Sequence, residues 1–180
     1  TELYDGYKIR TLEDSRAELE TGDKAEFRLG DNSLAEVIGT KTEIRIESLT
    51  VFVDSGDIWL SGGNIRVVSL IMESASTDAV LRVSVGADGT TEVKCYDGSV
   101  EIEYREPESM TEQLTDDTSD VSEEKESMSK IIPWDRELSS YEKMVISSKG
   151  QVMYYEDFSP DDIDEKTEWV EWNKKRDNID

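Results

Sequence analysis

The chain has 180 residues, with 43 acidic and 20 basic side chains, so its formal net charge at neutral pH is −23. Nucleic-acid phosphates and anionic lipid headgroups repel such a surface, which argues against nucleic acid as a partner. The chain has no histidine and so lacks the usual general base, transition-metal ligand and pH switch. We therefore expect a non-enzymatic protein with no catalytic residues, no cofactor and no specific metal site.

Short apolar or alternating runs, separated by turn residues, follow one another from residue 7 to residue 104. Turn signals such as Asp88-Gly89 and Asp97-Gly98 separate these runs. Alternation in the last run places Val100 and Ile102 on one face of a strand. The expected strands are 16–20, 25–29, 34–38, 43–47, 50–53, 57–60, 64–72, 80–85, 91–96 and 100–104.

Closely spaced turns between short strands are typical of an all-β fold, and the absence of intervening helical stretches argues against an α/β sheet. The sequence predicts an antiparallel sandwich or a β-helix-like domain over residues 1–105. Residues 106–129 hold nine acids against one lysine, so 106–130 is interpreted as an acidic linker or long loop. The alternative for this segment is an acidic strip that docks a basic partner.

Residues 131–180 are predicted to form a hairpin and one amphipathic helix that pack on the β domain. The hairpin strands are expected at 144–148 and 151–156, joined by Lys149-Gly150. Ser159 as N-cap and Pro160 at the first helical position predict a helix over 160–176. Ile163, Trp169, Val170 and Trp172 would cover about half of that helix, more apolar surface than a free-standing helix carries.

Large aromatic side chains are the best candidates for binding residues. Trp59, Trp169 and Trp172 are expected either to dock the C-terminal helix or to contact a protein partner. Cys95 is the single cysteine, lies in an alternating strand and is interpreted as a core thiol. The acidic runs, including 161–164, lack the spacing of a calcium-binding loop and predict at most weak cation binding.

Three segments together resemble the FecR domain of extracytoplasmic regulators of iron-transport signalling. Phe27–Val37 is similar to the first family pattern, and Leu49–Leu60 to the next. Thr77–Ile102 follows the closing pattern, with Asp88-Gly89 and Asp97-Gly98 at the family's turns. The resemblance covers about residues 16–104, and Trp169–Asp177 is similar to a helix that follows this domain in some secreted relatives.

The resemblance implies an extracytoplasmic, periplasmic or cell-surface module that binds a protein partner in the cell envelope as a sensor or scaffold. No segment of the sequence is long and apolar enough to span a bilayer, so an anchor, if the parent protein has one, lies outside these residues. Two alternatives stay open. One is a carbohydrate or cell-wall binding module with a row of exposed aromatics on one sheet face, and the other is a purely structural acidic domain of a surface protein.

Overall fold

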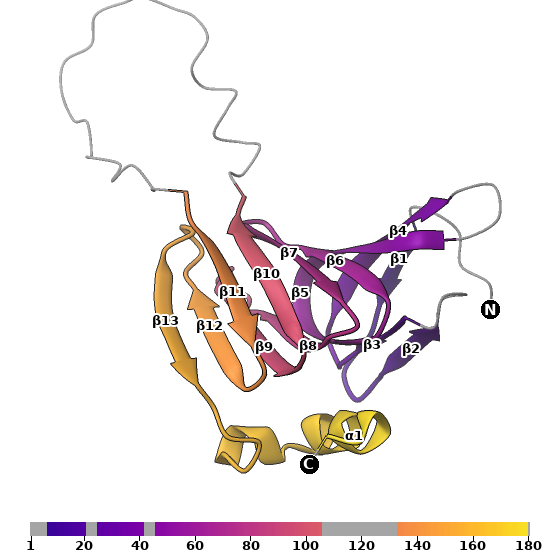
Figure 1. Ribbon diagram of the computed structural model, residues 1–180. Coiled ribbons are helices and arrows are strands. Elements are labelled where there is room, and N and C mark those ends of the chain that lie inside the picture. Colours follow the sequence, from indigo (N-terminus) through magenta and orange to yellow (C-terminus); the bar gives the residue numbers. More distant parts are fainter. Residues whose placement is uncertain (1–6, 21–24, 42–45, 106–132, 180) are drawn as a thin grey trace, which may run out of the picture.

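The computed structural model describes residues 7–20, 25–41, 46–105 and 133–179, and most of them form β-strands (Figure 1). The elements are β1 Tyr7–Arg10, β2 Ala17–Glu20, β3 Glu26–Leu29, β4 Leu34–Lys41, β5 Ile46–Ser61, β6 Asn64–Val68, β7 Met72–Thr77, β8 Val80–Val85, β9 Thr91–Asp97, β10 Ser99–Tyr104, β11 Asp135–Ser139, β12 Glu142–Ile146, β13 Val152–Asp157, the 3₁₀ helix η3 Ile163–Lys166 and the helix α1 Glu168–Asp177. The prediction of an all-β protein with a C-terminal helix is confirmed.

The long strand β5 belongs to two sheets. Its first half pairs with β4 and β6, and its second half pairs with β3 and β8. Between the two halves of β5 the register against β4 shifts, so that Asp54 has no partner in β4. Two residues later, Gly56 takes a φ of 94°. The prediction of separate strands at 50–53 and 57–60 with a turn between them is wrong, because the turn-forming residues make a bulge that bends one continuous strand.

The two sheets curl around β5 into a half-barrel (Figure 1). One runs in the order β11-β10-β7-β6-β5, with β4 and β1 on the other side of β5. The other runs from β5 through β8, β9 and β12 to β13, with β3 and β2 opposite. Among the described strand pairs, all are antiparallel except β5 with β6. We call the sheet that contains β6 and β7 sheet A, and the sheet that contains β8 and β9 sheet B.

The main core fills the space between sheets A and B. Val100 and Ile102 are both 1% exposed, which confirms that alternation places them on one buried face. Cys95 is fully buried in β9, as expected of a core thiol. Its burial, together with the negative charge of Asp97, raises the pKa of the thiol to about 12.

A second apolar cluster lies on the outer face of sheet B, under the C-terminal segment. It consists of Trp59, Val80, Tyr96, Phe158, Trp169 and Val170, with Trp172 and Ile179 packed against it. Within β5, Ile58 and Leu60 point into the main core, whereas Trp59 between them points into this second cluster. At β5, sheet B is therefore buried on both faces, which explains the uninterrupted apolar run Ile58–Leu60.

The C-terminal hairpin is confirmed as β12 and β13, with Gly150 at a φ of 77° in the turn between them. The prediction of one continuous helix over 160–176 is wrong in its first half. Thr167 is extended and caps α1 by accepting from the Val170 amide, so only η3 precedes it. Ile163, expected on the packing face, is 89% exposed. No helix among the described residues has the length and apolar character needed to cross a membrane.

Strands beyond residue 131 complete both sheets, because β11 pairs with β10 and β12 pairs with β9. The acidic segment 106–130 lies outside the described residues, and the domain limits 1–105, 106–130 and 131–180 stay a prediction.

Candidate functional site

The three tryptophans singled out from the sequence meet at the interface between α1 and sheet B. Trp59 is fully buried, Trp169 is 9% exposed, and Trp172 is half-buried and stacks on Trp169 with ring centroids 5.7 Å apart. Arg16 lies over both rings of that stack, 5.7 and 5.5 Å from their centroids. The structure thus brings all three together in docking the helix, while their binding of a partner stays a prediction.

A buried ion pair fixes the C-terminal end of α1 to sheet B. The Arg28 guanidinium donates from both terminal nitrogens to the two Asp177 carboxylate oxygens, each at 2.8 Å. Trp59 Nε1 donates to the same carboxylate at 2.6 Å. Burial opposes the charge on Arg28, but its hydrogen bonds to Asp177 and Glu26 outweigh that effect and raise its pKa.

A second buried polar group fixes η3. Glu165 is fully buried and accepts from Lys94 Nζ at 2.6 Å and from the Tyr96 hydroxyl. Burial opposes the charge on Lys94, yet the hydrogen bond to Glu165 outweighs it and raises the lysine pKa. Burial and the same carboxylate raise the pKa of Tyr96. These hydrogen-bonded groups hold the C-terminal segment on the sheet.

A run of exposed apolar side chains lies instead on the edge strand β13. Four consecutive side chains there are exposed: Val152 at 37%, Met153 at 52%, Tyr154 at 56% and Tyr155 at 48%. The other exposed large apolar residues among the described ones are scattered along the chain, as Leu70 illustrates at 62%. Because large apolar side chains gather at protein interfaces, β13 is the candidate docking edge of this chain.

Pairing within the hairpin shows which backbone groups of β13 face outward. In the regular part of the ladder, Tyr155 is in register with Met144 and Asp157 with Glu142. The next pair along is hydrogen-bonded, since the Phe158 amide donates to the Tyr141 carbonyl at 2.8 Å. Hydrogen-bonded and non-bonded pairs alternate in an antiparallel ladder, so the N–H and C=O groups of Tyr155 and Asp157 point away from β12.

Acidic groups cluster at the C-terminal end of this edge. Glu142 and Asp157 are directly opposed in register, an arrangement that is unfavourable for two like charges. A hydrogen bond between Tyr155 and Glu142 adds to desolvation in raising the tyrosine pKa, and the charge of Asp157 acts in the same direction. Glu156 is paired with Lys143 at 3.1 Å on the other face. The charge of Arg136 acts on Tyr155 in the opposite direction, so the two carboxylates outnumber one nearby cation and the charge at this end of the edge is negative on balance.

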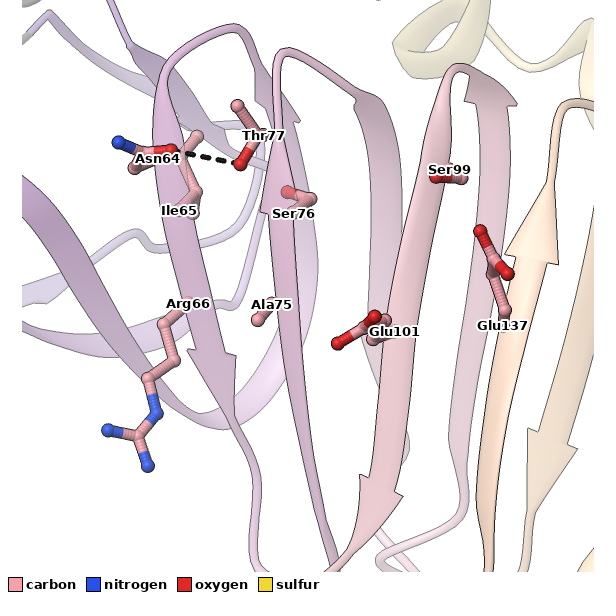
Figure 2. Close-up of a pocket in the computed structure, with 9 residues that line it drawn as sticks. All are labelled: Asn64, Ile65, Arg66, Ala75, Ser76, Thr77, Ser99, Glu101 and Glu137. Atoms are coloured by element: carbon pink, nitrogen blue, oxygen red, sulfur yellow. Dashed lines mark hydrogen bonds between the residues drawn. The ribbon is translucent and has the colours of Figure 1, made fainter.

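A shallow depression of about 480 Å³ lies on sheet A, over β6, β7, β10 and β11 (Figure 2). Thr77 donates to Asn64 at 2.9 Å at one end of it, and Glu101 and Glu137 stand on neighbouring strands at the other side. The lining is mostly polar and includes no aromatic side chain. It lacks the apolar walls that usually hold a small molecule.

Two kinds of reactive site can be checked among the described residues, a metal-binding cluster and an accessible thiol. No group of three or more of their Cys, Asp and Glu side chains is placed to hold a metal ion. The Asp161–Asp164 run serves local structure, since the Asp162 carboxylate accepts from the Ser159 amide at 2.9 Å. Cys95, the only thiol, is buried with a raised pKa, which disfavours the reactive thiolate.

Comparison with solved structures finds the same fold. Two crystal structures of a candidate anti-sigma factor from Parabacteroides distasonis, at 1.65 and 2.50 Å, superpose with a TM-score of 0.57 each. Sequence identity is 13% and 12%, and the match covers 84% of this chain. The chain spans 59% of the length of that protein. No protein-family model and no curated protein sequence matches the chain.

Sequence reasoning misses the docking edge. The pattern of Val152–Tyr155 indicates one strand of a hairpin, with no sign that the strand has a neighbour on one side only. Four large apolar residues in succession are unusual for the second strand of a surface hairpin, where every other residue normally faces water. This run of apolar residues is therefore a signal of exposed apolar surface, but it does not show that the strand lies at the edge of a sheet.

Proposed function

We propose that this chain is a non-enzymatic, protein-binding module of a regulatory protein that acts outside the cytoplasm, in envelope signalling related to FecR-type regulation. Two independent lines support this proposal. The strand order and turns of residues 16–104 resemble the FecR domain, and the fold is similar to that of a candidate anti-sigma factor. Neither line depends on a catalytic residue.

The observation that carries the proposal is the exposed apolar edge of β13. A soluble domain rarely leaves four large apolar side chains adjacent on an edge strand, since that arrangement invites association. A regulatory module needs such a surface, because its output is a change in what it binds.

The carbohydrate-binding alternative has less support. It requires exposed aromatic side chains in a row on one sheet face. Tyr154 and Tyr155 are successive strand residues and so lie on opposite faces. Tyr141, exposed at 37%, packs edge-on against Phe158 with ring centroids 6.0 Å apart. The exposed aromatics of the described residues therefore do not form a flat sugar-stacking platform.

The proposal is tested by replacing the gene in the source organism with the double variant Tyr154→Ser/Tyr155→Ser. Both side chains are about half exposed, so the variant is expected to fold and accumulate normally. RNA sequencing should show the same set of altered transcripts in this strain as in a strain lacking the gene. Leu70→Ser, which removes an equally exposed apolar side chain outside β13, is the matched control and should leave transcripts unchanged.

A second measurement addresses location. External protease should degrade the protein in cells with a permeabilised outer envelope while a cytoplasmic marker stays intact. Unchanged transcripts in the strain without the gene would contradict the regulatory role. Protection of the protein together with the cytoplasmic marker would contradict the extracytoplasmic location.

A further inference from the structure

We infer that β13 binds its partner by strand addition, and that the added strand is an extended segment of a basic protein. The inference rests on the proposed function and specifies the mode of binding and the chemistry of the partner. β13 ends the strand order of sheet B, and no other described strand pairs with its outer side. The outward N–H and C=O groups of Tyr155 and Asp157 are thus available to a new neighbour.

Regular geometry over Tyr154–Asp157 suits such pairing. The only register shift in the hairpin lies between Val145 and Ile146, which leaves Met153 as the bulged residue opposite them. Bulges usually protect an edge strand by bending it, but this bulge lies at the start of the strand and leaves the last four residues in continuous register. A partner strand can therefore form several successive backbone hydrogen bonds.

Side chains on both faces of β13 would cover the added strand. Tyr155 is in register with the buried Met144 and lies on the core face, whereas Tyr154, in register with Val145, lies on the opposite face. Each tyrosine is about half exposed, and apolar residues of an added strand can bury the exposed part of its ring. Backbone pairing supplies affinity, and these tyrosines with their charged neighbours supply specificity.

Charge selects a basic partner over a second copy of this chain. Two copies joined at β13 would bring together two molecules of net charge −23 and double the acidic groups at the edge. Glu142 and Asp157 already face each other in register, so a lysine or arginine beside Asp157 would relieve that repulsion. The same charge favours fast capture of a basic segment at low ionic strength.

Two synthetic ten-residue peptides test the inference. Both alternate valine and threonine and differ only in carrying three lysines or three glutamates. In an NMR titration of the whole chain, the lysine peptide is expected to bind and to slow hydrogen exchange at the amides of Tyr155 and Asp157. The glutamate peptide is expected to bind at least about tenfold more weakly at low salt, because like charges at an interface oppose association.

Two variants separate strand addition from simple charge attraction. Tyr155→Pro removes an outward N–H that makes no bond to β12, so the hairpin should persist while binding of the lysine peptide weakens about tenfold or more. Asp157→Lys should weaken the lysine peptide and strengthen the glutamate peptide. Leu70→Ser is the control that leaves both affinities unchanged, and melting temperatures are recorded for every variant.

Several results would overturn the inference. One is binding of the lysine peptide without protection of the two amides, and another is equal binding of both peptides. Protection of the same amides without peptide, in a dimer detected by sedimentation, would assign the edge to a second copy. If Tyr154→Ser/Tyr155→Ser alters transcripts but Tyr155→Pro does not and neither peptide binds, strand addition fails while the proposed function stands. If the peptides bind as expected but the strain lacking the gene has unchanged transcripts, strand addition stands while the proposed function fails.

Discussion

Substituting Asp177 by alanine should loosen the C-terminal helix from sheet B. The Asp177 carboxylate accepts two hydrogen bonds from Arg28 and one from Trp59, and the Arg28 side chain is 2% exposed. Removing one partner of a buried ion pair costs about 3–5 kcal/mol, because the remaining charge stays buried. Glu18 and Glu26 still pair with Arg28 but are themselves 36% and 34% exposed, so we expect the lower end, about 3 kcal/mol.

The assay is urea unfolding followed by tryptophan fluorescence, because three of the four tryptophans lie at the helix interface. Lys175→Ala, on the exposed face of the same helix, is the matched control and should change the unfolding free energy by less than about 0.5 kcal/mol. In an Arg28→Met background, Asp177→Ala should cost at least about 1 kcal/mol less than in the parent, since the buried charge that it would leave unpaired is gone. Equal and small effects of Asp177→Ala and Lys175→Ala would refute the assignment of this pair as the main fixing point of α1.

Three further outcomes follow from single sites. Cys95 has a pKa raised from 9.0 to about 12 by folding, so its contribution to stability is present below pH 9 and is lost as pH rises towards 12. The variant Cys95→Ala should lose less stability at alkaline pH than the parent, which is measured by melting temperatures over a range of pH. In the folded parent protein, the Cys95 thiol should resist alkylation by iodoacetamide at pH 8. Gly150→Ala should lower the unfolding free energy by about 2 kcal/mol or more, because Gly150 has a positive φ and an added Cβ would meet the Tyr104 ring. Thr167→Ala removes the hydroxyl that accepts from the Val170 amide and should cost about 1 kcal/mol in the same urea titration; an unchanged midpoint would contradict the capping role.

Local patterns in the sequence are reliable where one strand or one turn decides the outcome. The alternation of Val100 and Ile102 follows from the two-residue period of a strand, and it holds in whatever sheet the strand joins. The turns at Gly89, Gly98 and Gly150 are equally readable, because each glycine takes a positive φ that other residues rarely adopt.

The limit of the helix is not readable in the same way. Ser159 and Pro160 are a valid start signal, yet the chain there makes only a short turn and η3 before Thr167 caps α1. Here Glu165 is buried against Lys94, a residue 71 positions away in the chain. Capping preferences are worth about 1 kcal/mol, so a long-range buried ion pair can override them.

The sequence by itself determined the class of the fold, the identity of most strands and the absence of histidine chemistry, because composition, strand period and turn residues act over a few positions. Only the tertiary structure decided that Trp59 of β5 meets Trp169 and Trp172 of α1 in one interface, and that β13 ends a sheet with its apolar side chains exposed. The physical reason is that an edge is a property of the strand order. Whether a strand has one neighbour or two depends on pairings between segments far apart in the chain, and no local pattern records them.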